Sequence, residues 1–526
     1  MKKLSYIDYC ALPPFNQFLY NIYSTFFKVV FGLWNFIKNV AKGFVNFFVK
    51  IGKAFYNMFL SFKYGDAYTK VSFLFPGVSH IKRGQIIKGF LMILFELLFI
   101  LFMVVFGTTA IYRFTYLGNH GIGFLCENTG QFFDDNKEAS KYCDFPLPVE
   151  GDYSERNLLF GILAIIVVIF FVLFYVKSVN RSYQIQTEKE EGKHIPSFKE
   201  DVADFLNSKF HITLLALPIL GVVVFSILPL LDMICMAFTN YDAKHQYPNF
   251  FQWVGLDNFG LIFSFGSGGF GYTFVEILKW TVVWAIFATF LNFFLGIIVA
   301  TIINRKGIKF KKFWRTCLVL SIAVPQFVSL MALGQILGEY GPVTAIIEEL
   351  TGQKIRFLAQ AYTNINFGPW NVAIDFPRIM IILINIWIGI PYTVLTTTGI
   401  LMNVPEDLYE SARIDGATPA TMYFKITLRY IIFVMGPSLI TTFISNFNSF
   451  GVIYLLTGGG PKTNGFYGSA GHTDLLVTWL FNLTMTGNAD YKMASVIGIL
   501  IFIISASISL VVYRNSASFK NEEDFA

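Results

Sequence analysis

Long apolar blocks alternate with short polar segments along most of this chain. Each block runs for roughly 20 to 30 residues, and a helix of that length crosses the roughly 30 Å hydrocarbon core of a bilayer. Lipid offers the backbone no hydrogen-bond partners, so we expect helices, and the alternating strands of a membrane barrel do not occur in the pattern. We predict eight spanning helices, at residues 86–110, 157–176, 210–239, 273–303, 313–339, 378–402, 431–455 and 491–513.

Lysine and arginine are distributed unevenly between the polar segments. If the N-terminus is inside, the inner segments contain 27 of the 40 Lys and Arg residues and the outer loops contain 8. Membrane proteins concentrate basic residues on the cytoplasmic side, so we predict that both termini are cytoplasmic. The first outer loop agrees least with this layout, because it carries Arg113, Lys137, Lys141 and Arg156.

The composition supports a membrane protein and argues against a nucleic-acid partner. Hydrophobic residues make up 55% of the 526 residues and charged residues 14%, whereas soluble domains carry about a quarter of their residues as charges. The net charge of +6 comes from basic residues between the apolar blocks, so topology explains it. We predict no cleavable signal peptide in residues 1–11. The five cysteines lack metal-ligand spacing, and neither a metal nor a cofactor is expected in this chain.

An aromatic and lysine-rich stretch, from Phe15 to Phe62, precedes the first span. Its aromatic residues recur every three or four positions, with lysines interspersed among them. This pattern favours an amphipathic helix in the membrane interface, with the lysines toward anionic headgroups. A further spanning helix is the alternative, although so many lysines would be costly in hydrocarbon.

Cys126 and Cys143 lie in the first outer loop, at about 111–156. An exterior compartment permits a disulfide, but the sequence does not establish that the two sulfur atoms approach each other. Cys235 and Cys317 lie in or beside apolar blocks and are expected to be packing residues.

The segment 403–430, NVPEDLYESARIDGATPATMYFKITLRY, is too polar to enter the bilayer. Pro405 and the two acids after it suit the first turn of a helix. Gly416 interrupts that helix, and Pro419 lies at the start of a second one. A solvated connector is the alternative, but the compact pattern of small residues favours a helix–turn–helix that docks on a partner.

This segment resembles the EAA signature of importer-type ABC permeases, which forms a coupling helix. The counterparts of the signature here are Glu410, Ser411, Ala412, Gly416, Ile426 and Leu428. Ser411 stands where the signature has its first Ala, and Arg429 stands where it has a Pro.

The resemblance implies a surface that couples this chain to an ATPase. Short side chains would allow close approach, and two acids could pair with partner cations. The chain contains no GxxxxGK[ST] loop, so ATP and Mg are expected on a separate ATPase chain. The predicted ATPase-coupling residues are Glu410, Ser411, Ala412, Asp415 and Gly416.

Over residues 210–513 the chain resembles the MalF-type permease subunit of maltose/maltodextrin importers. The segments that carry this resemblance, besides the coupling loop, are AFTNYD (237–242), NIWIGIPYTVL (385–395), SNFNSFGVIYLLTGGGP (445–461) and HTDLLVTW (472–479). The resemblance implies an all-α membrane protein of about eight transmembrane helices, with the type I ABC importer permease fold and an N-terminal interfacial amphipathic segment.

The resemblance also implies partners. These are a second, MalG-like permease subunit, an ABC ATPase dimer, an extracellular sugar-binding lipoprotein and an oligosaccharide substrate, in the cell membrane of a bacterium. Only residues 240–272 follow the third span, where some members insert a large exterior domain. This shorter form resembles importers that work with a membrane-tethered binding protein.

Polar residues in the sixth and seventh spans are candidates for sugar contacts. Asn385, Gly389 and Tyr392 share one helix face, because they are spaced by four and three residues. Intramembrane amides are costly unless they face a cavity or each other, so a sugar site and interhelical hydrogen bonds explain the spacing equally well. The family resemblance favours the site. The predicted substrate-binding residues are Asn385, Gly389, Tyr392, Asn446 and Ser449.

The sequence therefore predicts a non-catalytic permease subunit of an ATP-driven importer for malto-oligosaccharides or related sugars, forming half of the translocation path. An ABC permease for a different oligosaccharide is an alternative, since Ile322 replaces an aromatic residue of the family. An ion-coupled secondary transporter is less favoured, because few acids lie within the spans. We predict three segments: 1–85, interfacial; 86–209, two additional transmembrane helices; and 210–526, a six-helix permease core containing the coupling loop 403–430.

Overall fold

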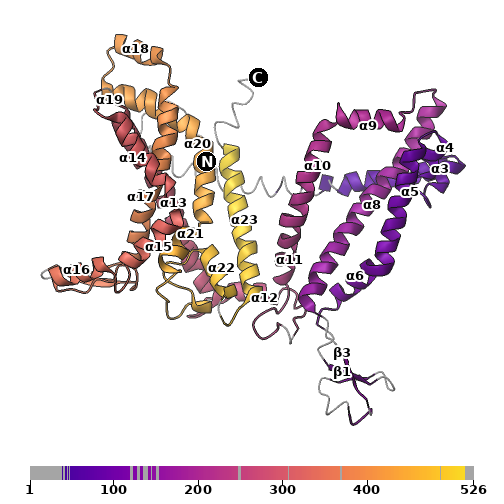
Figure 1. The fold of residues 1–526 in the computed structure, drawn as a ribbon, viewed down its shortest axis with the longest axis horizontal. Coiled ribbons are helices and arrows are strands. Elements are labelled where there is room, and N and C mark those ends of the chain that lie inside the picture. The colour runs from indigo at the N-terminus through magenta and orange to yellow at the C-terminus, as the bar shows by residue number, and fades with distance from the viewer. Residues whose placement is uncertain are drawn as a thin grey trace. The chain divides into compact units, whose positions relative to one another are not determined.

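The computed structural model describes residues 48–118, 123–126, 131–133, 140–143, 145–149, 153–246, 250–305, 307–367, 370–485 and 487–515, together with residues 13, 38, 42, 43, 45 and 46. The described chain forms two compact units that meet in sequence at Asn258 and Phe259 (Figure 1). The membrane-crossing segment that begins at Phe210 belongs to the first of these units.

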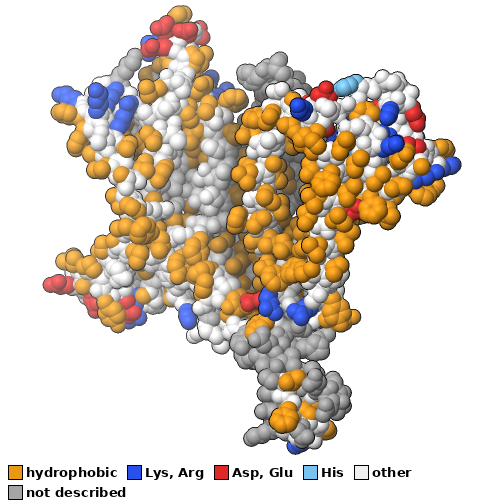
Figure 2. All heavy atoms as spheres, turned by 45° about the vertical axis from the view of Figure 1, so that its right-hand side comes forward, with side chains coloured by type: hydrophobic (Ala, Val, Ile, Leu, Met, Phe, Trp, Pro, Cys, Tyr) orange, Lys and Arg blue, Asp and Glu red, His pale blue; other side chains and the backbone are white. Residues whose placement is uncertain are grey.

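Helices long and apolar enough to cross a membrane make up most of the described residues. Among these residues there are seven such segments, Ile86–Thr115, Ser154–Glu190, Phe210–Met236, Phe270–Asn304, Phe376–Met402, Pro419–Thr457 and Tyr491–Leu510. A bent pair of helices makes an eighth if it is one span. Figure 2 shows hydrophobic side chains covering the surface between charged side chains at the two ends of the helices. The predicted all-helical membrane fold is confirmed.

Two of the three spans in the first unit carry a π-helical turn. The elements of this unit are α3 (Ala67–Val71), α4 (Val78–Lys82), α5 (Ile86–Phe102), the π-helix η1 (Met103–Gly107), α6 (Thr108–Thr115), β1 (Gly123–Cys126), β2 (Gln131–Phe133), β3 (Leu147–Val149), α8 (Ser154–Glu190), α9 (Phe198–Leu206), α10 (Phe210–Val222), the π-helix η2 (Val223–Ile227), α11 (Leu228–Met236) and α12 (Asp257–Gly260).

The second unit contains the other spans and the helix–turn–helix segment. Its elements are the 3-10 helix η3 (Leu261–Phe263), α13 (Phe270–Asn304), α14 (Lys311–Ala323), α15 (Gln326–Ile336), α16 (Pro342–Thr351), β4 (Thr363–Phe367), β5 (Trp370–Ile374), α17 (Phe376–Met402), α18 (Glu406–Ile414), α19 (Pro419–Met422), the π-helix η4 (Tyr423–Thr427), α20 (Leu428–Phe447), α21 (Gly451–Thr457), the 3-10 helix η5 (Tyr467–Ser469), α22 (Leu476–Met485) and α23 (Tyr491–Asn515).

The described strands form two small antiparallel sheets between spans. The first sheet has the order β2-β1-β3, and the second is the hairpin β4-β5. Cys126, the last residue of β1, is bonded to Cys143, so the disulfide that the sequence left open is present. This covalent link ties the end of β1 to residue 143 of the outer loop.

The fifth predicted span is not one straight helix. α14 and α15 are bent by 85° relative to each other at Val324 and Pro325. Pro325 lacks a backbone N–H and fixes its own φ, so the helix ends before it and restarts after it. The sequence located the proline but did not determine this angle.

The second span is longer than its apolar block. α8 continues to Glu190, fourteen residues beyond the predicted end at residue 176. The extension carries Lys and Arg and lies at the end of the spans where basic residues concentrate, here called the inner end. Lipid burial does not stabilise this polar extension, so its contacts with α3 and α4 are needed to hold it.

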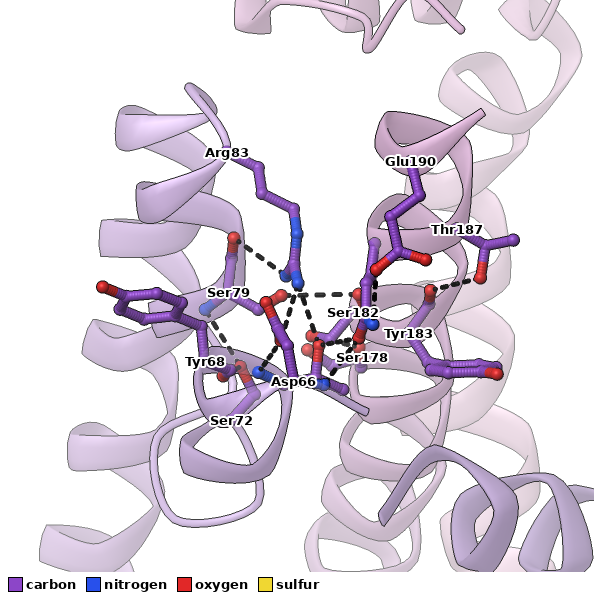
Figure 3. A network of polar contacts seen from close by, with 12 residues as sticks. Asp66, Tyr68, Ser72, Ser79, Arg83, Ser178, Ser182, Tyr183, Thr187 and Glu190 are labelled. Atoms are coloured by element: carbon purple, nitrogen blue, oxygen red, sulfur yellow. Dashed lines mark hydrogen bonds and ion pairs between the residues drawn. The ribbon is translucent and has the colours of Figure 1, made fainter. Parts of the chain in front are cut away.

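A buried polar network provides those contacts (Figure 3). Arg83 Nη2 lies 2.8 Å from Asp66 Oδ1 and donates to Thr69 Oγ1 at 3.0 Å. Gln186 of α8 accepts hydrogen bonds from the Thr69 hydroxyl at 3.0 Å and from the Asp66 backbone N–H at 2.9 Å. Arg83 is only 9% exposed, and a buried charge is tolerated when its donors are satisfied in this way. The network fixes the α3–α4 turn against the inner end of α8.

Most of the predicted interfacial stretch, Phe15–Phe62, lies outside the described residues. Its described end is helical from residue 48 to residue 64. In Figure 1 this indigo helix runs across the direction of α5 and α8. Phe55 and Phe59 are 48% and 60% exposed on it.

α13 and α17 form the centre of the second unit. Trp280 and Trp284 of α13 and Ile381 of α17 are buried and belong to one hydrophobic cluster. At two positions along these helices, a glycine allows the two helices to approach each other closely. A Cβ on Gly389 would lie 2.4 Å from Asn292 Nδ2, and a Cβ on Gly296 would lie 2.4 Å from Thr393 Cβ. This close seam carries Asn385 and Gly389 of the candidate site.

Candidate functional site

The segment 403–430 forms the predicted helix, turn and second helix. α18 begins after Pro405, with acidic residues in its first turn and Arg413 in its last turn, as the helix dipole favours. α19 begins after Thr418, whose side chain accepts a hydrogen bond from the Thr421 N–H at 3.2 Å. In Figure 1 α18 projects beyond the ends of the spans.

Gly416 ends α18 in a Schellman arrangement. Its N–H donates to the Arg413 carbonyl at 3.0 Å, and the Ala417 N–H donates to the Ala412 carbonyl at 2.9 Å. This closure needs a left-handed residue, and Gly416 has a φ of +73°. Among the described residues, no other group lies within 4 Å of where its Cβ would be. The glycine therefore sets the chain direction and leaves the surface beside it open.

The outer surface of α18 is exposed and carries both charge and an apolar side chain. Glu410, Ser411, Asp415 and Gly416 are exposed, and Ala412 is partly exposed. Ile414 is 86% exposed within the described chain, although it is a large hydrophobic residue. Figure 2 shows acidic side chains gathered over α18. A surface that combines carboxylates with an exposed isoleucine suits protein docking.

The side of α18 that carries Tyr409 is hydrogen-bonded to the start of the seventh span. Tyr409 Oη lies 2.8 Å from Thr427 Oγ1, and Thr427 is buried in the π-helix η4. η4 joins α19 to α20 without a break, and Arg429 is compatible with this continuity because it retains the N–H that a proline lacks. A groove of about 490 Å³ lies between α18 and the inner ends of α13 and α17, with Tyr409 and Arg413 in its lining.

Asn385 and Gly389 face α13. Asn385 is buried, and its backbone carbonyl accepts a 3.5 Å contact from Asn292 Nδ2. Within the described residues its own Nδ2 has no hydrogen-bond partner, and neither does Asn292 Oδ1. An unpaired buried amide is costly in a spanning helix, so these two atoms are available to a polar ligand. Gly389 is the position at which Asn292 fits against α17.

Asn446 and Ser449 lie where the seventh span loses its helical structure. α20 ends at Phe447, and α21 begins at Gly451. Asn446 Nδ2 donates to Thr289 Oγ1 of α13 at 3.0 Å, and its carbonyl accepts from Trp284 Nε1 at 3.0 Å. Non-helical backbone at membrane depth is tolerated where it is buried in protein or lines a cavity.

The structure thus places Asn385 and Asn446 against the same helix, α13. Sequence reasoning predicted this helix as a span but named none of its residues in the candidate site. Thr289 contacts Asn446, and Asn292, one turn further along α13, contacts Asn385. Both lie in a predicted span, and an asparagine inside an apolar block was the available signal for Asn292. Thr289 gave no such signal, because a threonine hydroxyl in a helix commonly hydrogen-bonds to a backbone carbonyl of the same helix.

Tyr392 lies in a different environment from Asn385 and Asn446. Its side chain is 55% exposed and lines a small cavity of about 40 Å³ at the bend between α14 and α15. Ile322 and Trp387 line the same cavity. Ile322, which replaces an aromatic residue of the family, is therefore a neighbour of Tyr392.

The two outer motifs that narrowed the resemblance, LLTGGGP and HTDLLVTW, contact each other directly. The Thr473 N–H donates to the Gly459 carbonyl at 3.1 Å, and the His472 N–H donates to the Pro461 carbonyl at 2.7 Å. A Cβ on Gly459 would lie 1.9 Å from Asp474 Oδ1. Burial raises the pKa of Asp474 to about 6, although the Gly471 N–H donates to its carboxylate at 2.8 Å and opposes the shift. The contact closes the loop between the last two spans.

Comparisons with known proteins identify a family and relatives that this chain resembles. Residues 292–518 match the family described as "Binding-protein-dependent transport system inner membrane component". The chain is similar to the galactooligosaccharides transport system permease protein GanP of Bacillus subtilis (strain 168), with 36% identity over 71% of this chain and 86% of that protein. It is also similar to the maltodextrin transport system permease protein MdxF of the same organism, with 32% identity over 86% of this chain and 95% of that protein.

A likeness to a solved structure accompanies these matches. The crystal structure of a bacterial ABC transporter involved in the import of the acidic polysaccharide alginate aligns with 60% of this chain and 97% of its own, at 22% identity and a TM-score of 0.46.

Proposed function

The chain belongs to the family of binding-protein-dependent transport permeases, and on that premise we propose that it imports malto-oligosaccharides or related sugars as half of a translocation path. Members of this family are inner-membrane transport components, and this chain is a multi-pass membrane protein. The names of its relatives support an oligosaccharide substrate. Its contribution is to bind sugar transiently and to change access, without making or breaking bonds.

The observation that carries the proposal is the projecting helix α18. It is exposed, ends at a left-handed glycine and is hydrogen-bonded to the seventh span through Tyr409. Such an element can dock in a cleft of another chain and transmit its movement to the membrane. We assign ATP and Mg²⁺ to an ABC ATPase dimer that docks at Glu410, Ser411, Ala412, Asp415 and Gly416.

The remaining partners and the topology are part of the same proposal. A second, MalG-like permease completes the path, and an extracellular sugar-binding lipoprotein delivers the substrate. The excess of Lys and Arg at the inner end supports cytoplasmic termini in a bacterial cell membrane. Asn385, Gly389, Tyr392, Asn446 and Ser449 are the proposed substrate-binding residues, with Asn292 and Thr289 behind them on α13.

A galacto-oligosaccharide is the second candidate substrate. The relative with that name shares 36% identity with this chain, compared with 32% for the maltodextrin relative. Both substrates present hydroxyl groups to buried amides, so the candidate site accommodates either by the same chemistry.

The test is sugar-stimulated ATP hydrolysis and uptake by the complete importer in proteoliposomes. We expect ATP-dependent uptake of maltotriose, or of a galactotriose if the second candidate is correct. The ratio of the two uptake rates decides between them. Uptake by this chain alone, driven by a proton or sodium gradient, would contradict the importer.

A further inference from the structure

A cavity of about 970 Å³ lies at the inner end of the first unit. It is enclosed by α5, α8 and α9, with the start of α10 at its edge. Met92, Phe174 and Phe205 give it apolar walls, and charged side chains surround them. The cavity lies in the unit that precedes the coupling loop, and the proposed transport mechanism gives it no role.

Two spanning segments of the unit diverge beside this cavity. α8 packs against α11, and Figure 1 shows α8 and α10 diverging from that contact toward α9. α9 bridges the divergent ends and starts with a capping box at Ser197 and Glu200. Leu214 and Leu217 of α10 are exposed large hydrophobic residues.

Most charges around the cavity are paired within the protein. Lys88 Nζ lies 2.8 Å from Asp201 Oδ2, and His194 Nε2 lies 2.9 Å from Glu200 Oε2. Lys209 pairs with Asp204, and Arg181 pairs with Glu188 at 2.7 Å.

Lys177 differs from these residues. It lines the cavity on α8 one turn beyond Phe174, it is exposed, and it has no ion-pair or hydrogen-bond partner among the described residues. Among the described cations that line the cavity, Lys177 is thus the one without an acidic partner, and it lies beside an apolar wall. That combination matches a ligand with one negative charge and a hydrocarbon body.

We propose that this cavity binds an anionic phospholipid with a single net negative charge, its phosphate at Lys177 and its acyl chains against the apolar walls of the cavity. Basic pockets between spanning helices at the inner side of a membrane commonly hold such headgroups. The apolar walls formed by Met92, Phe174 and Phe205 would contact the upper part of the chains. The inference rests on the proposed topology, which places this end in the cytoplasmic leaflet.

The test is lipid retention by the complete importer, measured by native mass spectrometry after exchange into phosphatidylglycerol or phosphatidylcholine. We expect wild-type protein to prefer phosphatidylglycerol. Lys177→Gln should reduce that preference roughly five-fold, the effect of one lysine near a charged surface, and Lys177→Arg should retain it. Lys189→Gln is the matched control, because Lys189 is exposed on the same helix but does not line the cavity.

Three results would overturn the proposal. The first is an equal lipid preference in wild type and Lys177→Gln. The second is displacement of phosphatidylglycerol by millimolar inorganic phosphate, which would indicate a site for the free anion. The third is a photo-crosslinker at position 177 that reacts with the second permease and not with lipid. Co-purification of the ATPase is measured in the same samples, so a failure of the importer proposal is distinguishable from a failure of this one.

Discussion

Tyr409 Oη and Thr427 Oγ1 lie 2.8 Å apart and connect the projecting helix α18 to the π-helical start of the seventh span. The residues are separated by the whole turn that contains Gly416. Thr427 is buried, whereas most of α18 is exposed, so this contact joins a surface element to the membrane core. Besides the chain through α19, it is a direct link through which movement of α18 can reach α20.

Tyr409→Phe should weaken coupling while leaving assembly intact. The substitution keeps the ring and removes one hydrogen bond, which is worth about 1 kcal/mol. We expect sugar uptake per ATP hydrolysed to fall several-fold in proteoliposomes. Tyr430→Phe is the control, because the Tyr430 hydroxyl makes only a 3.5 Å contact with the Asn403 carbonyl. Equal losses in both variants would show that the Tyr409 contact has no special role.

Gly416→Trp should prevent docking of the ATPase without loss of membrane insertion. A side chain at a φ of +73° strains the backbone by about 1 to 2 kcal/mol, and the indole would occupy the open surface beside α18. Co-purification of the ATPase measures the effect.

Gly352→Trp provides the matched control for docking. Gly352 has a φ of +69° after α16, and a Cβ there also has no other group within 4 Å. It lies in a predicted outer loop, so the same strain and bulk should leave the ATPase bound. Retained docking and transport in Gly416→Trp would refute the assignment of the coupling surface.

Asn446→Ala should change the response to sugar and leave the complex assembled. If Asn446 contacts substrate, stimulation of ATP hydrolysis by a short and a long oligosaccharide should fall by different factors. Thr289→Val removes the present partner of Asn446 with little change in shape. Similar losses of thermal stability in both variants, with unchanged rates across sugars, would instead favour an interhelical hydrogen bond.

Gly459→Ala should destabilise the loop between the last two spans. A Cβ at this position would lie 1.9 Å from Asp474 Oδ1, at a φ of +87°. Gly458→Ala is the control, since its φ is +60° but its Cβ would meet no other group within 4 Å. The strain alone costs about 1 to 2 kcal/mol, and the collision should add about 2 kcal/mol or more. Melting temperatures in detergent compare the two variants, and equal temperatures would contradict the predicted collision.

The sequence by itself determined the spans and the helix–turn–helix segment. Both depend on local properties: the transfer of apolar residues into lipid, and the proline, first-turn acids and glycine that begin and end α18. Because these properties are local, they did not determine where each helix ends. α8 extends beyond its apolar block because Gln186 is held by Asp66 and Thr69, which lie far away in sequence.

Only the tertiary structure decided which polar residues meet. Asn385 and Asn446 were predicted on two helices, but the structure brings each against α13, at Asn292 and Thr289. That pairing depends on the rotation and separation of packed helices, which Gly389 permits by admitting Asn292 against α17. Helical periodicity assigns a residue to a face, but close packing between helices determines what that face touches.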